Sequence, residues 1–204
     1  MPFRIVPVVE GDGEIAAVPV LFNRLIAEFD PGTPIKVERP IKQQKSSLLK
    51  EGGIERAVSL AAISLGDPGA IFILLDSDGD CPARLGPRLY GRARGARPDK
   101  QISLVLAHQE FEAWFLASGS SLKGLRTLSD NIENHQAPES VRGCKEWLET
   151  WMPAASRYSP TTDQAALAAT FDMSLARRGA PSFDKLCREF EAICQYARSV
   201  VVDA

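Results

Sequence analysis

The chain has 204 residues, of which 45% are hydrophobic, and a formal net charge of −2 at pH 7. This length and composition are enough to bury a core without disulfides or metals, which excludes a disordered chain. No apolar run approaches the roughly 18 residues of a membrane span, and Glu10 and Asp12 come too early for a secretory signal. We therefore expect a globular cytoplasmic protein.

The cysteines and histidines do not form a zinc-binding pattern. The four cysteines lie apart without a C-x-x-C pair, and His108 and His135 stand alone. Cys187 and Cys194 fall on the expected apolar face of one helix, where thiols serve as small hydrophobic groups. We expect the cysteines to be reduced and buried.

The first half of the chain alternates apolar strand-like runs with helical patterns. The expected strands are residues 4–9, 34–41, 70–75 and 101–107, of which the second is the weakest. Apolar residues recur at helical spacing over 18–29 and 54–65. The central strands are apolar throughout, as in parallel sheets that helices cover on both faces. The pattern predicts an α/β fold with a parallel sheet flanked by helices.

After the last strand the chain is expected to be helical. One helix is expected over residues 138–151, and another follows Thr161 and Gln164, which have capping-box spacing. Ser182 is the expected cap of a last amphipathic helix. The predicted domains are an α/β metal-binding domain at 1–119 and a helical extension packed on it at 120–204.

Acidic residues follow three of the expected strands. They are Glu10 after the first, Asp76, Asp78 and Asp80 after the third, and Glu110 and Glu112 after the fourth. The carboxyl ends of parallel strands meet at one edge, where ligands bind. Carboxylates gathered in one crevice repel one another unless a cation joins them, and all-oxygen ligands favour Mg²⁺ or Mn²⁺. A site for a divalent metal is therefore expected, with Glu110 preferred to Glu112 because it is nearer the strand end.

Each acidic segment alone has an ordinary structural explanation. Asp-x-Asp-Gly is also a common turn sequence, and Glu112 would suit a helix N-terminus. A calcium-binding EF-hand is excluded, because Cys81 and Pro87 occupy the positions that require Gly and Glu. The combination at successive strand ends is what indicates a metal site.

The segments VVEGDGE and LLDSDGD resemble the Toprim pattern, a strand-end Glu followed by a strand-end Asp-x-Asp. That superfamily includes topoisomerases, bacterial primases and the overcoming-lysogenization-defect nucleases. The resemblance implies that Glu10 is a general acid/base or metal ligand and that Asp76 and Asp78 bind metal. No tyrosine has a recognisable nucleophile setting, which points to hydrolysis by metal-bound water. Lys145 is a candidate for neutralising transition-state charge, although a lysine on the solvated face of a helix would give the same sequence pattern.

The whole chain resembles a Toprim-like bacterial family, domain of unknown function 4276, which is distantly similar to those nucleases. The matching segments are VEGDGE, LLDSDGDCP, EFEAWFLAS, RGCKEWL, YSPTTDQAAL and SFDKL. Members are often encoded beside an ATPase. The resemblance implies a nuclease that acts with a partner ATPase in bacterial defence.

Two basic stretches are candidate nucleic-acid contacts, with DNA expected ahead of RNA. The residues are Lys42 and Lys45 in the first stretch and Arg84, Arg88, Arg92 and Arg94 in the second. Glycines in the second stretch indicate a partly mobile segment beside the metal site. A solvated basic surface is the alternative for either stretch.

Two other functions remain open at this point. An apolar strand followed by Asp-x-Asp-Gly also resembles the nucleophile motif of haloacid-dehalogenase phosphatases, but Asp80 replaces the usual Thr and Glu10 would have no role. The second alternative is a non-catalytic regulatory subunit of an ATPase.

Overall fold

A five-stranded parallel sheet forms the centre of the computed structural model, which describes residues 1–202. The strands are β1 (Phe3–Val9), β2 (Ile35–Val37), β3 (Ile41–Lys42), β4 (Gly69–Asp76) and β5 (Gln101–Ala107). Their order is β2-β1-β4-β5, and β3 pairs with β1 beyond the end of β2. Every ladder is parallel, so the α/β fold expected from the sequence is confirmed.

The edge strand expected at 34–41 is broken into β2 and β3. Ile5 pairs with Val37 and Val8 pairs with Ile41, so the edge strand advances four residues while β1 advances three. The extra residue falls beside Pro40, which has no N–H to give to a ladder. The break lets β3 run on to the sheet end where β1 and β4 finish.

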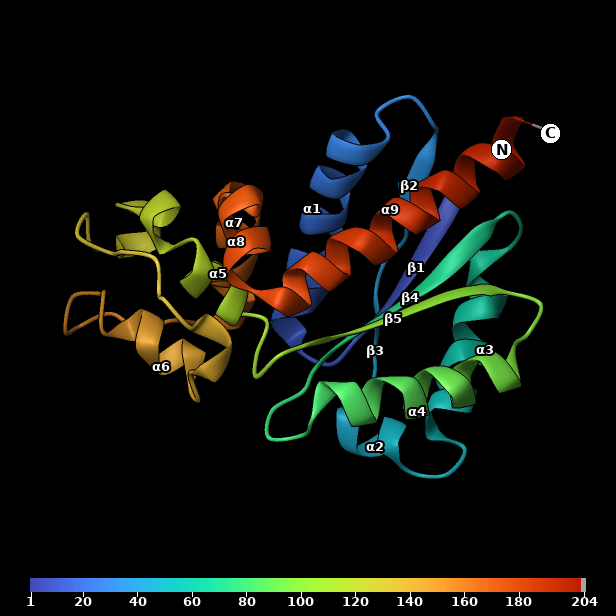
Figure 1. Cartoon of the computed structure of the whole chain (residues 1–204), viewed down its shortest axis with the longest axis horizontal. Coiled ribbons are helices and arrows are strands. Elements are labelled where there is room, and N and C mark those ends of the chain that lie inside the picture. The colour runs from blue at the N-terminus through green and yellow to red at the C-terminus, as the bar shows by residue number, and fades with distance from the viewer. Residues whose placement is uncertain (203–204) are drawn as a thin grey trace.

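Helices cover both faces of the sheet (Figure 1). On one face lie α1 (Asp12–Phe29) and α9 (Pro181–Val202), and on the other lie α2 (Lys45–Leu49), α3 (Gly53–Leu65) and α4 (Pro82–Ala96). Alternate residues of β4 divide between the two apolar clusters: Phe72 faces α1 and α9, whereas Ile71 and Ile73 face α3 and α4. This double burial explains why the central strands are apolar throughout.

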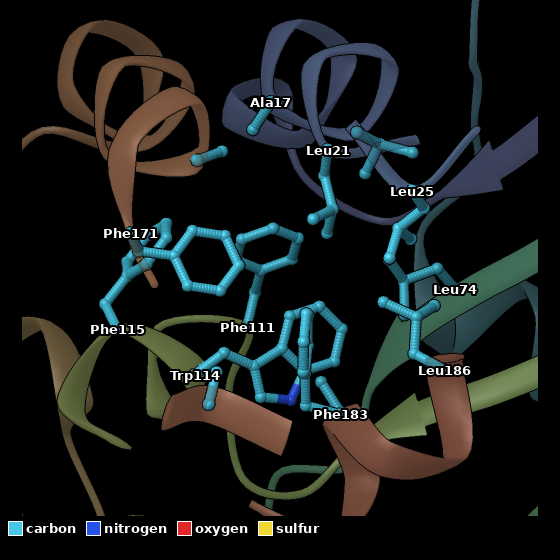
Figure 2. Close-up of a cluster of buried hydrophobic side chains, with 14 of the residues drawn as sticks. Ala17, Leu21, Leu25, Leu74, Phe111, Trp114, Phe115, Phe171, Phe183 and Leu186 are labelled. Atoms are coloured by element: carbon cyan, nitrogen blue, oxygen red, sulfur yellow. The ribbon is translucent and has the colours of Figure 1, made fainter. Parts of the chain in front are cut away.

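The segment between β5 and α9 forms a helical lobe at one end of the sheet (Figure 1). It contains α5 (Ala113–Ala117), α6 (Cys144–Glu149), α7 (Ala165–Thr170), α8 (Met173–Gly179), three 3₁₀ turns and a π-helical turn at Pro160–Gln164. Figure 2 shows Phe111, Trp114, Phe171 and Phe183 packed beside Leu21 of α1. One apolar cluster therefore joins the lobe to the sheet.

Several local expectations for this half are wrong. The helix expected over 138–151 is a 3₁₀ turn followed by α6, because Gly143 adopts a left-handed conformation with φ 76°. Ser182 does not cap a helix; its Oγ accepts hydrogen bonds from Trp114 Nε1 and from the backbone N–H of His108. Gln164 does not complete a capping box, since its amide donates to Glu112.

The cysteines are unpaired, and Cys144, Cys187 and Cys194 are buried as expected, whereas Cys81 is exposed. Burial raises the pKa of the Cys144 thiol to about 12. Within residues 1–202, no helix combines the length and apolar character that a bilayer crossing requires.

Candidate functional site

The carboxyl ends of β1 and β4 meet at one cavity of about 510 Å³. Glu10 follows β1, Asp76 ends the neighbouring strand β4, and Asp78 lies in the turn beyond it. All three line the cavity, so the structure brings these predicted site residues together. Their proximity follows from adjacent parallel strands that end at the same level of the sheet.

Glu14, which the sequence analysis did not single out, lies on the floor of this cavity. It is 4% exposed, and its Oε2 accepts hydrogen bonds from the backbone N–H groups of Glu10 (2.8 Å) and Gly11 (3.1 Å). Burial, with smaller contributions from Glu112 and Glu10, raises the pKa of Glu14 to about 7. Burial and then Asp78 raise the pKa of Glu10, whose Oε2 has no hydrogen-bond partner within the described chain.

Gly13 allows the lobe to close over the start of α1. A Cβ at this position would lie 2.6 Å from the carbonyl oxygen of Pro160 and 2.5 Å from Gln164 Oε1. Only glycine fits such a close approach. The π-helical turn that carries both residues can therefore form one wall of the cavity.

Asp76 is held at the centre of the site by the segment that follows β5. Its Oδ1 accepts a hydrogen bond from the backbone N–H of Phe111 at 2.8 Å. Ser77 Oγ accepts from the N–H of Gln109, so the ends of β4 and β5 are joined twice. Burial raises the pKa of Asp76 well above its usual range, and the charges of Glu14 and Glu112 raise it further.

Glu112 is fully buried and enters the cavity from the start of α5. Its Oε1 accepts hydrogen bonds from Tyr158 Oη at 2.9 Å and from Gln164 Nε2 at 3.2 Å. Its Oε2 has no hydrogen-bond partner among the described residues, although Lys145 Nζ lies 3.4 Å away. Burial raises the pKa of Glu112, against the opposing effect of Lys145.

Lys145 of α6 reaches the cavity instead of remaining a solvated helix lysine. Its Nζ lies 3.2 Å from Glu110 Oε2 and 3.4 Å from Glu112 Oε2. Burial alone would lower the pKa of Lys145, but Glu112, Asp76 and Glu110 outweigh it and raise the pKa.

Glu110 was preferred to Glu112 as a metal ligand, but the structure places them differently. Glu112 lines the cavity and Glu110 does not. Residues 108–112 form bends and a turn rather than a regular helix, and Gln109 has a positive φ of 65°. Both carboxylates can therefore approach Lys145 from adjacent positions.

Lys45 was expected to contact nucleic acid, but it is buried beside the turn after β4. Its Nζ donates to the Ser77 carbonyl oxygen at 2.6 Å and pairs with Asp78 Oδ2 at 2.8 Å and Asp80 Oδ2 at 3.1 Å. Burial would lower the pKa of Lys45, yet these carboxylates raise it. Lys42 in turn pairs with Asp12 at 2.7 Å.

A second cavity of about 490 Å³ adjoins the first on the side of α2. Glu10 and Asp78 line both cavities, while Lys42, Lys45 and Ser46 line only the second. The two cavities therefore form an acidic side and a more basic side of one site.

The second basic stretch is not a mobile loop, because it forms the regular helix α4. Arg92 binds Glu55 through two hydrogen bonds of 2.7 and 2.8 Å, which joins α4 to α3, and Arg94 donates to the carbonyl oxygen of Lys100. Arg84 and Arg88 are exposed, and Arg84 lies in the first turn after the Asp80 segment. Arg84 and Arg88 are therefore the arginines of this stretch that are available to a ligand near the cavity.

Tyr158 and Gln164 were also missed as site residues. Both come from the YSPTTDQAAL segment, 46 and 52 residues beyond the carboxylate that they bind. No local spacing indicates such a contact. Glu14 did carry a signal, because it stands at the third position of a helix that follows Gly11, where an acidic side chain caps the N-terminus.

The carboxylate oxygens around the cavity are the kind of ligands that a hard divalent cation prefers, but they do not lie close enough together to coordinate one ion. Glu10 keeps a buried carboxylate oxygen without a hydrogen-bond partner in the part of the chain described, and the Oε2 atoms of Glu110 and Glu112 face only the ammonium of Lys145, at 3.2 and 3.4 Å. Oxygen donors of this kind suit Mg²⁺ or Mn²⁺. Within residues 1–202, however, no group of three or more His, Cys, Asp and Glu side chains has the spacing to hold a metal ion as it stands.

Comparison with known proteins gives one match. The family model described as a domain of unknown function (DUF4276) covers residues 9–191, which include every carboxylate of the site. No curated protein and no solved structure gives a significant match to the chain. Because the match extends over most of its length, the chain belongs to the DUF4276 family.

Proposed function

We propose that this protein is a Toprim-like nuclease that hydrolyses phosphodiesters with Mg²⁺ or Mn²⁺. The observation that carries the proposal is the convergence of Glu10, Asp76 and Glu112, which follow three strands of one sheet, on a single cavity. Glu10 keeps one carboxylate oxygen without a hydrogen-bond partner in the described chain, and the second oxygen of Glu112 has only Lys145 Nζ beside it, at 3.4 Å. Unpaired buried carboxylates are costly, and a cation would remove that cost.

Glu10, Asp76 and Glu112 are the residues that would hold the cation. Glu112 is already oriented, because Tyr158 and Gln164 bind its Oε1 and its Oε2 faces Lys145 at 3.4 Å. Glu10 is only partly buried, so its side chain has room to rotate towards the other two. This freedom reconciles the proposed site with the absence of a finished ligand group in residues 1–202.

The bound cation would polarise the phosphodiester and favour ionisation of water. In the proposed hydrolysis, a water oxygen attacks phosphorus, the bond to the leaving oxygen breaks, and that oxygen takes up a proton. Glu10 would hold the cation through one carboxylate oxygen and accept the proton of the attacking water on the other. Lys145 would stabilise the negative charge that builds on the phosphoryl oxygens.

The surroundings of Asp76 favour this reaction over a phosphoaspartate mechanism. A phosphatase nucleophile has to approach phosphorus directly, but Asp76 is flanked by the charges of Glu14 and Glu112. These carboxylates would repel a phosphate in the absence of a cation. In the metal-dependent reaction, each of these acidic neighbours instead helps to attract the cation.

The remaining parts of the proposal concern partners. DNA is proposed ahead of RNA as substrate, with an ATPase as partner in bacterial defence, on the resemblance of the acidic motifs to those of Toprim-like nucleases; the matched family is described only as a domain of unknown function. The exposed Arg84 and Arg88, in the first half of α4, are the proposed backbone contacts.

The test is a nuclease assay on the purified chain with Mg²⁺, Mn²⁺ or EDTA. Plasmid DNA, single-stranded DNA and single-stranded RNA serve as substrates. Wild type is expected to cleave at least one of them with metal, and Asp76→Ala is expected to abolish cleavage. The matched control is Asp99→Ala, which changes an exposed aspartate before β5.

Metal binding by wild type without cleavage of any substrate would contradict the catalytic proposal. That outcome would favour the regulatory-subunit function, in which the site is structural. Cleavage that persists in EDTA, or in Asp76→Ala at the wild-type rate, would contradict the assignment of the reaction to this cavity.

A further inference from the structure

Lys45 lies where a metal ion would be expected in an Asp-x-Asp turn. Its side chain is 8% exposed, and its ammonium lies within 3.1 Å of three oxygens, from the Ser77 carbonyl, Asp78 and Asp80. Lysine is seldom buried to this extent unless it is paired. The turn therefore already contains a cation that belongs to the protein itself.

The backbone on both sides of this contact is constrained. Asp78 has a positive φ of 49°, and the N–H of Asp80 donates to the carbonyl of Ser77 at 2.9 Å. Lys45 begins α2 directly after β3, and the neighbouring Leu48 is fully buried. Lys45 is thus supplied by a packed element and is not a surface side chain that happens to reach the turn.

We propose that Lys45 occupies the second cation position of the site, so that the chain binds a single divalent cation through Glu10, Asp76 and Glu112. This inference rests on the proposed metal-dependent function and specifies its stoichiometry. Asp78 and Asp80 then hold the lysine instead of a metal ion. A divalent cation at the same oxygens would have to displace the ammonium or share a carboxylate with it, and like charges about 4 Å apart repel strongly.

The ammonium of Lys45 also lies beside the boundary between the two cavities, since Lys45 lines the second cavity and its partner Asp78 lines both. A second metal ion would be exchangeable, whereas the lysine is always present. The positive charge on that side of the site is therefore independent of metal concentration.

The test is the number of Mn²⁺ ions bound, measured by titration calorimetry and by the electron paramagnetic resonance signal of bound Mn²⁺. Wild type is expected to bind one equivalent. Lys45→Met is expected to bind a second equivalent, with the spin-coupled signal of a metal pair, and the double variant Lys45→Met/Asp80→Asn is expected to lose it again. Lys45→Arg and the control Lys42→Met are expected to bind one equivalent.

The single variant Asp80→Asn tests the inference even if Lys45→Met does not fold. It is expected to keep one equivalent with the wild-type affinity, because Asp80 serves only the lysine. Loss of that equivalent would overturn the inference. Two equivalents in wild type, or one equivalent in a folded Lys45→Met protein, would also overturn it.

The same data separate this inference from the proposed function. If wild type bound no metal, the proposed metal chemistry would be wrong. The assignment of Lys45 would then depend on the variant alone: an equivalent gained by Lys45→Met would support it, and none would overturn it.

Discussion

Asp76 and Asp78 stand two residues apart in one motif but have opposite surroundings. Asp76 ends β4 at the cavity wall, where burial and neighbouring carboxylates raise its pKa. Asp78 is 60% exposed and is neutralised by Lys45. The positive φ of Asp78 explains the difference, because the chain leaves the strand there and the side chain turns towards α2. The motif therefore provides one carboxylate for the cavity and one for a structural ion pair.

The two groups of acids around these residues differ in the same way. Asp76 and Glu112 share one nearby cation, Lys145, and the carboxylate of Glu14 adds a third negative charge beside them. Asp78 and Asp80 share Lys45, and both side chains are at least half exposed to solvent. Glu14, Asp76 and Glu112, the inner group, therefore have a charge that the proposed cation would balance, whereas Asp78 and Asp80, the outer group, are already paired with Lys45.

The largest expected difference is between Asp76→Asn and Asp78→Asn. Both substitutions remove one charge with little change of shape. Asp76→Asn is expected to lower metal-dependent cleavage by at least about 10²-fold, because it removes a charged ligand of the proposed cation. Asp78→Asn is expected to lower it by no more than about tenfold, because its loss weakens only the contact to Lys45. Initial rates at saturating Mn²⁺ measure both.

Calorimetric Mn²⁺ affinities of the same two variants serve as the control. Asp76→Asn should bind metal more weakly than Asp78→Asn. The distinction between inner and outer carboxylates would be broken if Asp78→Asn lost as much affinity and activity as Asp76→Asn.

Tyr158→Phe tests whether the inner group depends on its orientation. The substitution removes the hydroxyl that donates to Glu112 Oε1 and leaves the Gln164 contact in place. Loss of a hydrogen bond to a metal ligand usually costs about 10- to 100-fold in metal affinity, and we expect the lower end of that range. Mn²⁺ calorimetry measures the effect, and Tyr90→Phe, at an exposed tyrosine of α4, is the matched control.

A Tyr158→Phe protein that keeps the wild-type Mn²⁺ affinity would show that metal binding does not depend on the hydroxyl of Tyr158. Urea unfolding of the same variant checks that any loss of affinity is not simply partial unfolding.

Glu14→Gln tests the electrostatic cost of the inner group in metal-free protein. The pKa of Glu14 is about 7 in the folded chain, above its ordinary value of 4.5. A raised pKa means that stability is full below about pH 4.5 and falls as the pH rises through 7. Glu14→Gln removes this loss, so at pH 8 its free energy of unfolding should exceed that of wild type by about 3 kcal/mol.

Urea unfolding in EDTA at pH 5 and pH 8 measures the Glu14→Gln effect, and the gain should shrink at pH 5. An equal gain at both pH values would mean that Glu14 acts through packing and not through its charge. Glu28→Gln is the control, because it changes a surface glutamate of the same helix.

The sheet could be predicted from the sequence because strands that are buried on both faces, such as β4, consist almost entirely of apolar residues. The sequence also predicted that Glu10 and Asp76 meet, since adjacent parallel strands end together. It did not predict the break of the edge strand at Pro40. The contact of Tyr158 with Glu112 was also missed, because it depends on how the lobe folds back over α1.

The basic residues show the same limit. Charge alone could not distinguish Lys45, which is buried in an ion pair, from Arg84, which is exposed. Arg92 likewise binds Glu55 of a neighbouring helix. Composition predicts that a segment is basic, but only the tertiary fold decides which of its charges remain available to a ligand.

The smallest expected effect belongs to Arg84 and Arg88, which lie on the solvent side of α4. If they contact the phosphate backbone, replacing both with Gln should weaken nucleic-acid binding several-fold. The slope of log affinity against log salt concentration should also become shallower by about one unit per lost contact. Arg97→Gln is the control from the far end of the same helix, about 20 Å from Arg84 at 1.5 Å per residue. Fluorescence anisotropy with catalytically inactive Asp76→Ala in several salt concentrations gives both quantities. If the salt slope changed as much per replaced arginine in Arg97→Gln as in the double variant, α4 would contribute only general positive charge. The nucleic acid would then have to lie along Lys42 and the second cavity.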